Sequence, residues 1–254
     1  MRPVVLVGVG ELGGYFAQGF LRTGYRVIPV RRQDSMATVA KNNPEPEVVI
    51  VAVGEADLDD VLAEVPPVWS ARVVLMQNEL VPGSWQRHEI QSPTVAVVWF
   101  EKKPKQPVKE LLPTAVFGPH AIPVEAALGA MGIVTTRILN YESLVHALVE
   151  KNLYILTTNI AGLEVGGTTS NLWSRHRRLA LTVAREVLRI QGHLVGEALP
   201  EEKLLASLER ALLADPEHQC TGRSAPGRLA RALGIAQTAE IDVPELTRIS
   251  ELPR

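Results

Sequence analysis

The chain has 254 residues, of which 46% are hydrophobic, and this is enough for one large domain or two modest ones with separate cores. Its 26 basic and 28 acidic residues give a net charge of −2 at pH 7. This balance argues against nucleic acid or an anionic membrane as a partner. No stretch reaches the roughly 18 apolar residues that a membrane-spanning helix needs.

The cysteine and histidine content points away from disulfides and metals. Cys220 is the single cysteine, which excludes a disulfide within the chain and is typical of a reducing cytosol. We therefore expect a cytoplasmic protein. None of the six histidines pairs with another at metal-ligand spacing, so we expect no metal site.

The first half of the chain alternates short, valine-rich runs with helical stretches. Continuous runs of this length are typical of strands that are buried on both faces of a parallel sheet. The runs cover residues 3–8, 25–30, 47–53 and 72–76, with helices expected at about 11–23 and 55–65. Further strands are expected at 94–100, 114–117 and 134–139, and a helix at 123–131. The pattern predicts a doubly wound sheet whose later strands form an antiparallel edge.

After about residue 140 the β-branched runs stop and helical periodicity takes over. Helices are expected at 142–164, 173–192, 200–213 and 226–233. The predicted fold is α/β, with a Rossmann-type, mostly parallel sheet followed by an all-helical C-terminal domain. We predict a nucleotide-binding domain over 1–140 and a helical domain over 141–254 that serves substrate binding and dimerisation, which is compatible with a homodimer.

The first strand ends in the glycine-rich turn Gly8-Val9-Gly10-Glu11-Leu12-Gly13. In a GxGxxG turn the first glycine permits a tight bend, the second lets a pyrophosphate approach the backbone, and the third lets the helix pack close to the sheet. The backbone N–H groups at the helix start, including those of Glu11 and Leu12, then face the phosphates. The position between a strand and a helix predicts a dinucleotide site. The alternative is a glycine-rich turn with no ligand.

The end of the second strand indicates which dinucleotide binds. NAD sites usually carry an acid here that accepts hydrogen bonds from the ribose hydroxyls. In this chain the strand ends with Arg31 and Arg32, whose guanidinium groups match a phosphate and cannot accept a hydroxyl proton. The pair favours NADP(H). The alternative is that the arginines only solvate the strand end.

The first long C-terminal helix carries a polar stripe. Lys151 lies nearly opposite its apolar face, with Tyr154, Thr158 and Asn159 beside it. An amine, a phenol, a hydroxyl and an amide in one group could bind and protonate a carbonyl oxygen. The alternative is an ordinary amphipathic helix with this side in water. The apolar face consists of Val149, Leu153, Leu156, Ile160 and Leu163.

These motifs together resemble the ketopantoate reductase (2-dehydropantoate 2-reductase) family, within the wider group of 6-phosphogluconate-dehydrogenase-like proteins. The match rests on the glycine turn, on Arg32 at the position of the family's 2′-phosphate arginine, and on Gln77-Asn78 at a strand end. It continues with the helix that begins Val149-Glu150-Lys151 and carries Asn159. The closing segments Gly234-Ile235 and Val243-Pro244-Glu245-Leu246-Thr247-Arg248 are also similar to those of the family.

The resemblance implies an NADPH-dependent reductase of a small 2-oxo acid or a related carbonyl compound. Asn78 would lie near the nicotinamide and the substrate. Lys151 would be the general acid that protonates the keto oxygen as NADPH delivers hydride, and Asn159 would bind the substrate.

The substrate half departs from the family pattern at three positions. A family asparagine is Ile155 here, a family lysine falls at Gly54, and the glycine after the strand-end asparagine is Glu79. These departures keep a second hypothesis open, a non-catalytic NADP(H)-binding or sensor protein that kept the fold and lost the substrate site. A third is that the fold binds another nucleotide, or none.

Overall fold

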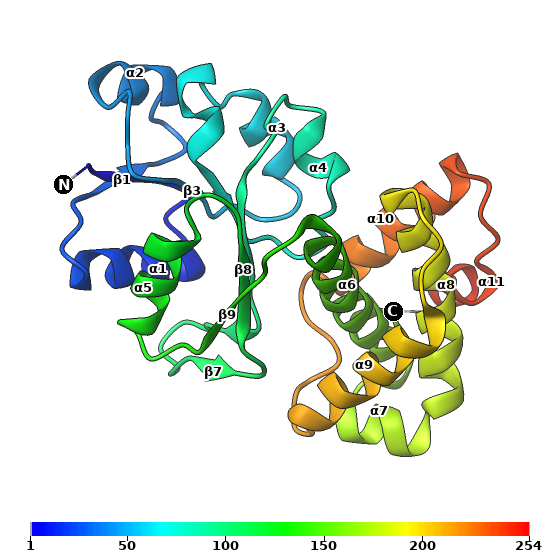
Figure 1. Cartoon of the computed structure of the whole chain (residues 1–254). Helices are drawn as coiled ribbons and strands as arrows, with labels where there is room; N and C mark the ends of the chain where they lie inside the picture. Colours follow the sequence, from blue (N-terminus) through cyan, green and yellow to red (C-terminus); the bar gives the residue numbers. More distant parts are fainter. Residues whose placement is uncertain (1, 254) are drawn as a thin grey trace. The chain divides into compact units, whose positions relative to one another are not determined.

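The computed structural model describes residues 2–253. The chain packs into two compact units, Met1–Ala147 and Leu148–Arg254, and the division falls within the long helix α6 (Tyr141–Val165). Figure 1 shows the sheet of the first unit and the helices of the second.

The first unit is built on a seven-stranded sheet with the order β2-β1-β3-β4-β5-β8-β9. Strands β2, β1, β3, β4 and β5 run parallel, β8 is antiparallel to β5, and β9 is parallel to β8. The strands are β1 (Val4–Val7), β2 (Val27–Val30), β3 (Val49–Val51), β4 (Val73–Leu75), β5 (Thr94–Val97), β8 (Thr114–Phe117) and β9 (Thr135–Arg137). The predicted antiparallel edge is confirmed.

Helices cover both faces of this sheet because the buried strands are apolar on each side. Side chains of β1 alternate between two cores, with Leu6 in one and Val7 in the other. One core is closed by α1 (Glu11–Arg22) and α5 (Ala121–Gly129), which lie side by side in Figure 1. The other is closed by α2 (Met36–Asn42) and the 3₁₀ helix η1 (Pro67–Arg72). Two short helices, α3 (Leu58–Ala63) and α4 (Gly83–Gln86), complete the crossovers.

The strand predicted over 94–100 is interrupted by a change of sheet. The run 94–100 stays in the sheet only as far as Val97, and the chain then enters a separate antiparallel hairpin. The hairpin consists of β6 (Phe100–Glu101) and β7 (Lys109–Glu110). Phe100 remains buried and stacks on Phe16 of α1, so its hydrophobic side chain still serves the core.

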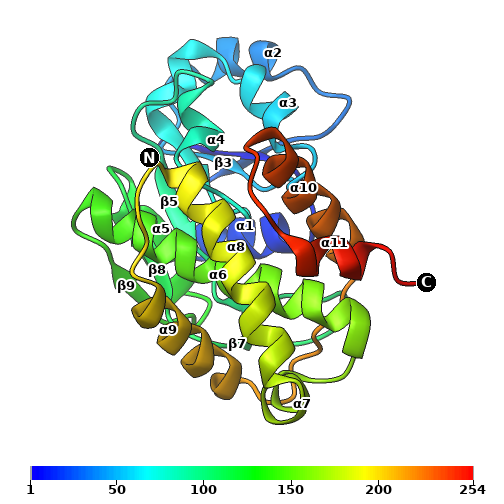
Figure 2. The same ribbon diagram turned by 90° about the vertical axis from the view of Figure 1, so that its right-hand side faces the viewer.

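Over residues 148–253 the second unit is built from helices, with one isolated β-bridge between Thr168 and Gln219, and this confirms the predicted helical C-terminal region. After α6 come α7 (Thr169–Arg175), α8 (Arg177–Val195), α9 (Glu201–Ala214), α10 (Ala225–Thr238) and α11 (Pro244–Ser250). The single helix predicted over 173–192 is wrong at its start, because the helix breaks at His176, which ends α7 and precedes α8. Figure 2 shows α11 beside α8 and α10.

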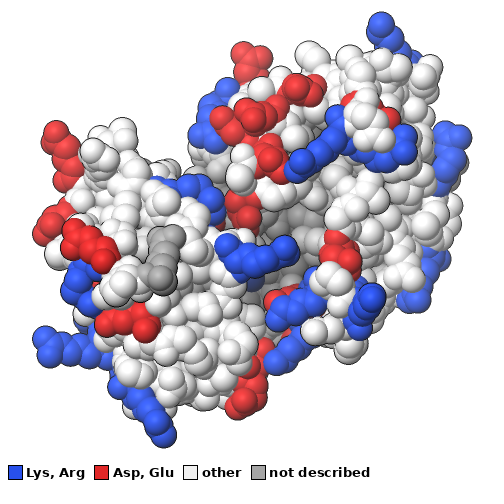
Figure 3. Space-filling model, turned by 180° about the vertical axis from the view of Figure 1, so that it is seen from behind, with Lys and Arg blue, Asp and Glu red and all other residues white. Residues whose placement is uncertain are grey.

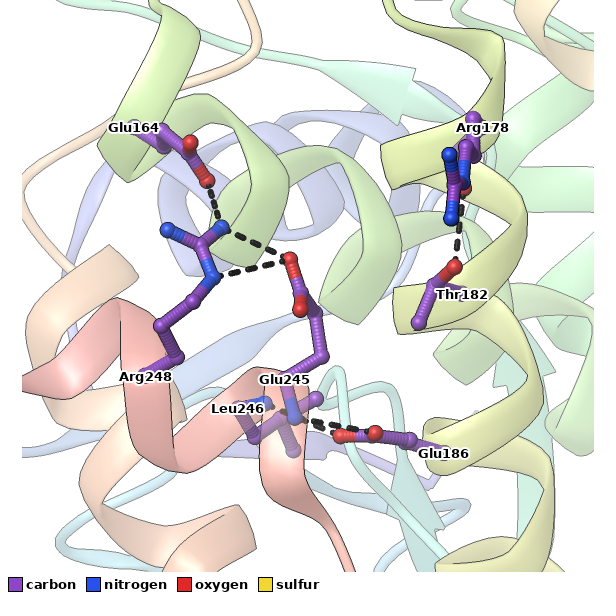
Figure 4. Close-up of polar contacts among 7 residues, drawn as sticks. All are labelled: Glu164, Arg178, Thr182, Glu186, Glu245, Leu246 and Arg248. Atoms are coloured by element: carbon purple, nitrogen blue, oxygen red, sulfur yellow. Dashed lines mark hydrogen bonds and ion pairs between the residues drawn. The ribbon is translucent and has the colours of Figure 1, made fainter.

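The closing segment is held by charged contacts (Figure 4). The buried carboxylate of Glu186 on α8 accepts hydrogen bonds from the backbone N–H groups of Glu245 and Leu246, at 3.0 and 2.9 Å. It therefore caps the start of α11 from another helix. Arg248 of α11 binds the carboxylates of Glu164 and Glu245. These contacts explain why a seven-residue helix is stable here.

Charged side chains of both signs are interspersed over the face in Figure 3. Within residues 2–253, no helix is both long and apolar enough to cross a membrane.

Candidate active site

The turn after β1 can be formed only by glycine at two of its positions. Gly8 has a φ of +90°, and a Cβ there would lie 2.7 Å from the carbonyl oxygen of Ala52. A Cβ on Gly13 would lie 2.3 Å from the carbonyl oxygen of Gly8. Both contacts are with backbone, so neither neighbour can move aside cheaply. The roles predicted for these two glycines agree with this packing.

Gly10 is different, because no atom lies within 4 Å of a Cβ built on it. It is the N-cap of the 12-residue helix α1, and no side chain caps the helix there. The open space beside Gly10 thus lies at the positive end of the helix dipole, an arrangement that fits a pyrophosphate. Of the neighbouring predicted residues, Glu11 lies 3.4 Å from Lys102 and Leu12 packs on the core.

The topology brings this turn to the edge where parallel α/β sheets bind ligands. The chain leaves β1 toward β2 on one side, and β3 lies on the other. The carboxyl end of β1 is therefore a topological switch point. Arg31, Gly54 and Asn78 follow the neighbouring parallel strands β2, β3 and β4, so they belong to the same edge of the sheet.

The two arginines after β2 are held differently. Arg31 makes a two-nitrogen contact with Asp34, at 3.0 Å from Nε and 3.3 Å from Nη2. This contact lowers the pKa of the Asp34 carboxyl. Arg32 makes one contact of 3.3 Å with Asp57, and its side chain is 92% exposed. A surface pair of this kind adds about 0–1 kcal/mol, so Arg32 can exchange Asp57 for a phosphate at little cost.

The ends of β3 and β4 are joined by amide hydrogen bonds. Gln77 donates to the carbonyl oxygens of Val51 and Val53, at 2.7 and 3.3 Å. Asn78 donates from Nδ2 to the carboxylate of Glu55 at 3.0 Å. Because a carboxylate only accepts hydrogen bonds, this contact fixes which atom of the amide is the nitrogen. The amide oxygen of Asn78 therefore points away from Glu55.

The polar stripe of α6 is buried, so its interpretation as a solvent-facing surface is wrong. Lys151 is 9% exposed, and Tyr154, Thr158 and Asn159 are all buried. The hydroxyl of Thr158 donates to the carbonyl oxygen of Tyr154 at 2.8 Å. Buried polar and charged groups are costly unless they serve structure or chemistry, which makes this stripe a better site candidate than its spacing alone suggests.

Sequence reasoning missed the partner of Asn159. The buried side chain of Arg228 on α10 donates from Nη1 to Oδ1 of Asn159 at 2.7 Å. The available signal was helical spacing, since Arg228 falls on the same face of α10 as the buried residues Ala225, Leu229 and Ala232. A charged residue on an apolar helix face is unusual and needs a partner.

No family model and no curated protein matches this sequence. Solved structures match it by fold. A dimeric ketopantoate reductase from Staphylococcus aureus matches with a TM-score of 0.68 at 15% identity, covering 98% of this chain and 96% of that one. A PanE/ApbA family ketopantoate reductase from Ralstonia eutropha JMP134 gives 0.67 at 16% identity, with coverage of 98% and 96%. D-mandelate dehydrogenase in complex with NADH gives 0.68 at 10% identity, with the same coverage. This chain has the ketopantoate reductase fold.

Glu79 occupies a left-handed backbone conformation, with a φ of 61°. The ketopantoate reductase family, which the sequence resembles, has glycine at this position. Glycine adopts such a φ without steric cost. We expect Glu79→Gly to raise the free energy of unfolding by about 1 kcal/mol, because a non-glycine residue in this region costs about 1–2 kcal/mol. Glu79→Ala should give no such gain. Urea unfolding of the two variants tests this, and equal midpoints would show that the strain does not lie in the backbone of Glu79.

A hollow of about 490 Å³ in the first unit lies away from the glycine turn. Its walls come from the residues before β5 and after β8 and β9, and include Trp85, Phe117 and Tyr141. These positions lie at the amino end of β5, at the opposite edge of the sheet from the turn. The hollow therefore does not form part of the candidate nucleotide site.

Cys220 is buried, and burial raises the pKa of its thiol to about 11. This apolar environment is the opposite of the exposed, electropositive surroundings that activate a cysteine nucleophile. Among the described residues there is no group of three or more His, Cys, Asp or Glu side chains that could hold a metal.

Proposed function

We propose that the protein is an NADPH-dependent reductase of a small 2-oxo acid or a related carbonyl compound. The observation that carries the proposal is the glycine turn at the switch point of the sheet, with open space at Gly10. It occurs in a fold shared with ketopantoate reductases and with D-mandelate dehydrogenase. Because ketopantoate reductases are among these structural neighbours, ketopantoate is the leading candidate substrate.

Within this proposal each site residue has one role. Gly8, Gly10 and Gly13 shape the turn, the N–H groups of Glu11 and Leu12 bind the phosphates, and Arg31 and Arg32 lie toward the 2′-phosphate. When bound, the cofactor supplies a hydride to the substrate carbonyl. Asn78, oriented by Glu55, would bind near the nicotinamide and the substrate. Lys151 would donate the proton that the reduced oxygen requires, and Asn159 would bind the substrate.

A screen of 2-oxo acids tests the proposal. The purified protein is mixed with NADPH and with ketopantoate, pyruvate, 2-oxobutanoate, 2-oxoisovalerate or phenylglyoxylate, and the loss of absorbance at the nicotinamide band is followed. We expect at least one of these acids to be reduced. Tight binding of NADPH without turnover of any of them would support the second hypothesis instead.

That second hypothesis, a non-catalytic NADP(H)-binding or sensor protein, is favoured by Gly54. A Cβ at this position would meet no atom within 4 Å, so there is room for a side chain where the family has its lysine. The chain supplies no amine from this position. Ile155 likewise brings no polar group in place of a family asparagine.

The preference for NADPH is expected to depend on Arg32. We expect Arg32→Ala to weaken NADPH binding about 10- to 100-fold, because a charge-assisted contact to a phosphate is worth about 1.5–3 kcal/mol. NADH binding should change little. The measurement is fluorescence titration with each cofactor.

Arg31→Ala is the matched control, since Arg31 is held by two contacts to Asp34. It should cost less NADPH affinity than Arg32→Ala. Equal affinity of the unmodified protein for NADPH and NADH would remove the argument for a 2′-phosphate site.

We also propose a cytoplasmic homodimer. The fold likeness to a dimeric ketopantoate reductase supports the assembly, and the free, buried Cys220 is in keeping with a reducing compartment. Light scattering after size-exclusion chromatography would detect a dimer.

A further inference from the structure

The hairpin formed by β6 and β7 lies at the same edge of the sheet as the glycine turn. Strand β5 runs parallel to β1, and β8 begins beside the carboxyl end of β5, with Ala115 opposite Val97. The chain therefore enters and leaves the hairpin at the carboxyl edge of the parallel strands. The ring centroid of Phe100 on β6 lies 5.5 Å from that of Tyr15 and 6.3 Å from that of Phe16, both on α1. These contacts pack the hairpin against the helix that follows the glycine turn.

Two residues after Phe100, the hairpin brings Lys102 to the start of α1. The Lys102 ammonium group donates to the carbonyl oxygens of Lys103 and Gln106, at 2.7 and 3.0 Å. The same group lies 3.4 Å from Oε2 of Glu11, and the Lys102 side chain is only 20% exposed. Because two carbonyl groups of the hairpin hold the ammonium group, its positive charge is fixed beside the Glu11 carboxylate.

Glu11 occupies a position where a negative charge has opposite effects on folding and on ligand binding. It is the first residue of α1 and directly follows Gly10. A carboxylate at a helix start is favourable for the helix itself, because it lies at the positive end of the helix dipole. A phosphate at the same helix end would be repelled by that carboxylate. In the proposed function the backbone N–H groups of Glu11 and Leu12 bind the phosphates, so the two negative groups would share one helix end.

We propose that Lys102 permits the pyrophosphate to bind by neutralising Glu11, and that the β6–β7 hairpin is therefore part of the cofactor site. Lys102 is a positioning residue in this proposal, because it acts through Glu11. The glycine motif does not include this residue, which comes from a separate segment about 90 positions along the chain. The inference rests on the proposed function, because it takes the glycine turn as the phosphate site.

A double-mutant cycle read by fluorescence titration with NADPH tests the inference. Lys102→Met should weaken NADPH binding about tenfold, because the charge of Glu11 is then uncompensated. Glu11→Gln should bind NADPH at least as tightly as the unmodified protein, because the lysine charge is then no longer cancelled. The double variant should bind NADPH within about threefold of the unmodified protein. Loss of a residue that only held the hairpin in place would not be rescued by Glu11→Gln.

Lys103→Met is the matched control in the same hairpin. The Lys103 ammonium group pairs with Glu101 at 3.0 Å, so this variant loses the same charge without exposing Glu11. Its NADPH affinity should stay within about twofold of the unmodified value. Urea unfolding of every variant without cofactor shows whether a change in affinity is caused by a loss of folding.

Three results would overturn the inference. The first is an NADPH affinity of folded Lys102→Met within twofold of the unmodified value. The second is a double variant that binds as weakly as Lys102→Met, and the third is a more than threefold loss of affinity in Glu11→Gln alone. A cycle that behaves as expected while no 2-oxo acid is reduced would contradict only the proposed reductase activity. Absence of NADPH binding to the unmodified protein would contradict both proposals.

Discussion

Replacing Lys151 with methionine is expected to lower kcat about 1,000-fold, in line with the 10²- to 10⁴-fold contribution of a positioned general acid. Methionine keeps most of the volume of this buried side chain and removes only the amine. NADPH affinity should stay within about twofold of the unmodified protein, because the phosphate contacts proposed for the cofactor lie on other residues. Stopped-flow turnover with a reducible 2-oxo acid and fluorescence titration measure the two quantities.

Lys203→Met is the matched control, since Lys203 is an exposed lysine on α9. It should leave kcat unchanged. A kcat of Lys151→Met within tenfold of the unmodified value would show that another group donates the proton. The pH profile of kcat distinguishes a proton donor from a residue with a merely structural role. Loss of the general acid should remove one limb of the profile, whereas loss of a structural residue should lower the whole curve.

The parts of the fold that could be predicted are those whose signal lies within one element. Valine-rich runs such as Val4–Val7 and Val49–Val51 are apolar on every side chain, so a buried parallel strand is the interpretation that fits them. The long helix predicted over 142–164 is Tyr141–Val165 in the structure. The glycine turn is equally local as a pattern, because its glycines fall between Gly8 and Gly13, although the close packing of Gly8 involves the distant Ala52.

The elements that were missed depend on partners far along the chain. Helix α11 has seven residues, too few to be stable alone, and is capped by Glu186 from 59 residues away. In the sequence, Glu186 looks like any other charged residue of an amphipathic helix, and its role as the cap of α11 is not visible. The same reason hid the contact between Arg228 and Asn159, whose residues are 69 positions apart.

The proposed substrate site also depends on packing that the sequence does not show. Spacing could place Lys151, Tyr154, Thr158 and Asn159 on one side of a helix, but could not say whether that side faces water. Burial decides between the two interpretations, and burial is a property of the packed chain. The resemblance to ketopantoate reductases pointed toward a site at this position without showing the packing around it.

Two alanine substitutions in the glycine turn are expected to separate ligand binding from folding. At Gly10 the backbone has a φ of −85°, which alanine adopts freely, and a Cβ would meet no protein atom within 4 Å. Gly10→Ala should therefore change the free energy of unfolding by less than about 1 kcal/mol. The added methyl group would occupy the space proposed for the pyrophosphate. Loss of two N–H contacts to phosphate at about 1.5 kcal/mol each would weaken NADPH binding about 100-fold.

Gly13→Ala should behave in the opposite way, because its Cβ would lie 2.3 Å from the carbonyl oxygen of Gly8 and 3.1 Å from the Cβ of Ala52. Helix α1 would have to move away from the sheet, at a cost of about 3 kcal/mol in the free energy of unfolding. Urea unfolding measures the stability of both variants, and NADPH titration measures their cofactor affinity. Gly10→Ala should lose mainly affinity, and Gly13→Ala should lose mainly stability. If Gly10→Ala bound NADPH normally, the open space at the start of α1 would not be the phosphate site, and the nucleotide would have to bind elsewhere along the carboxyl edge of the sheet.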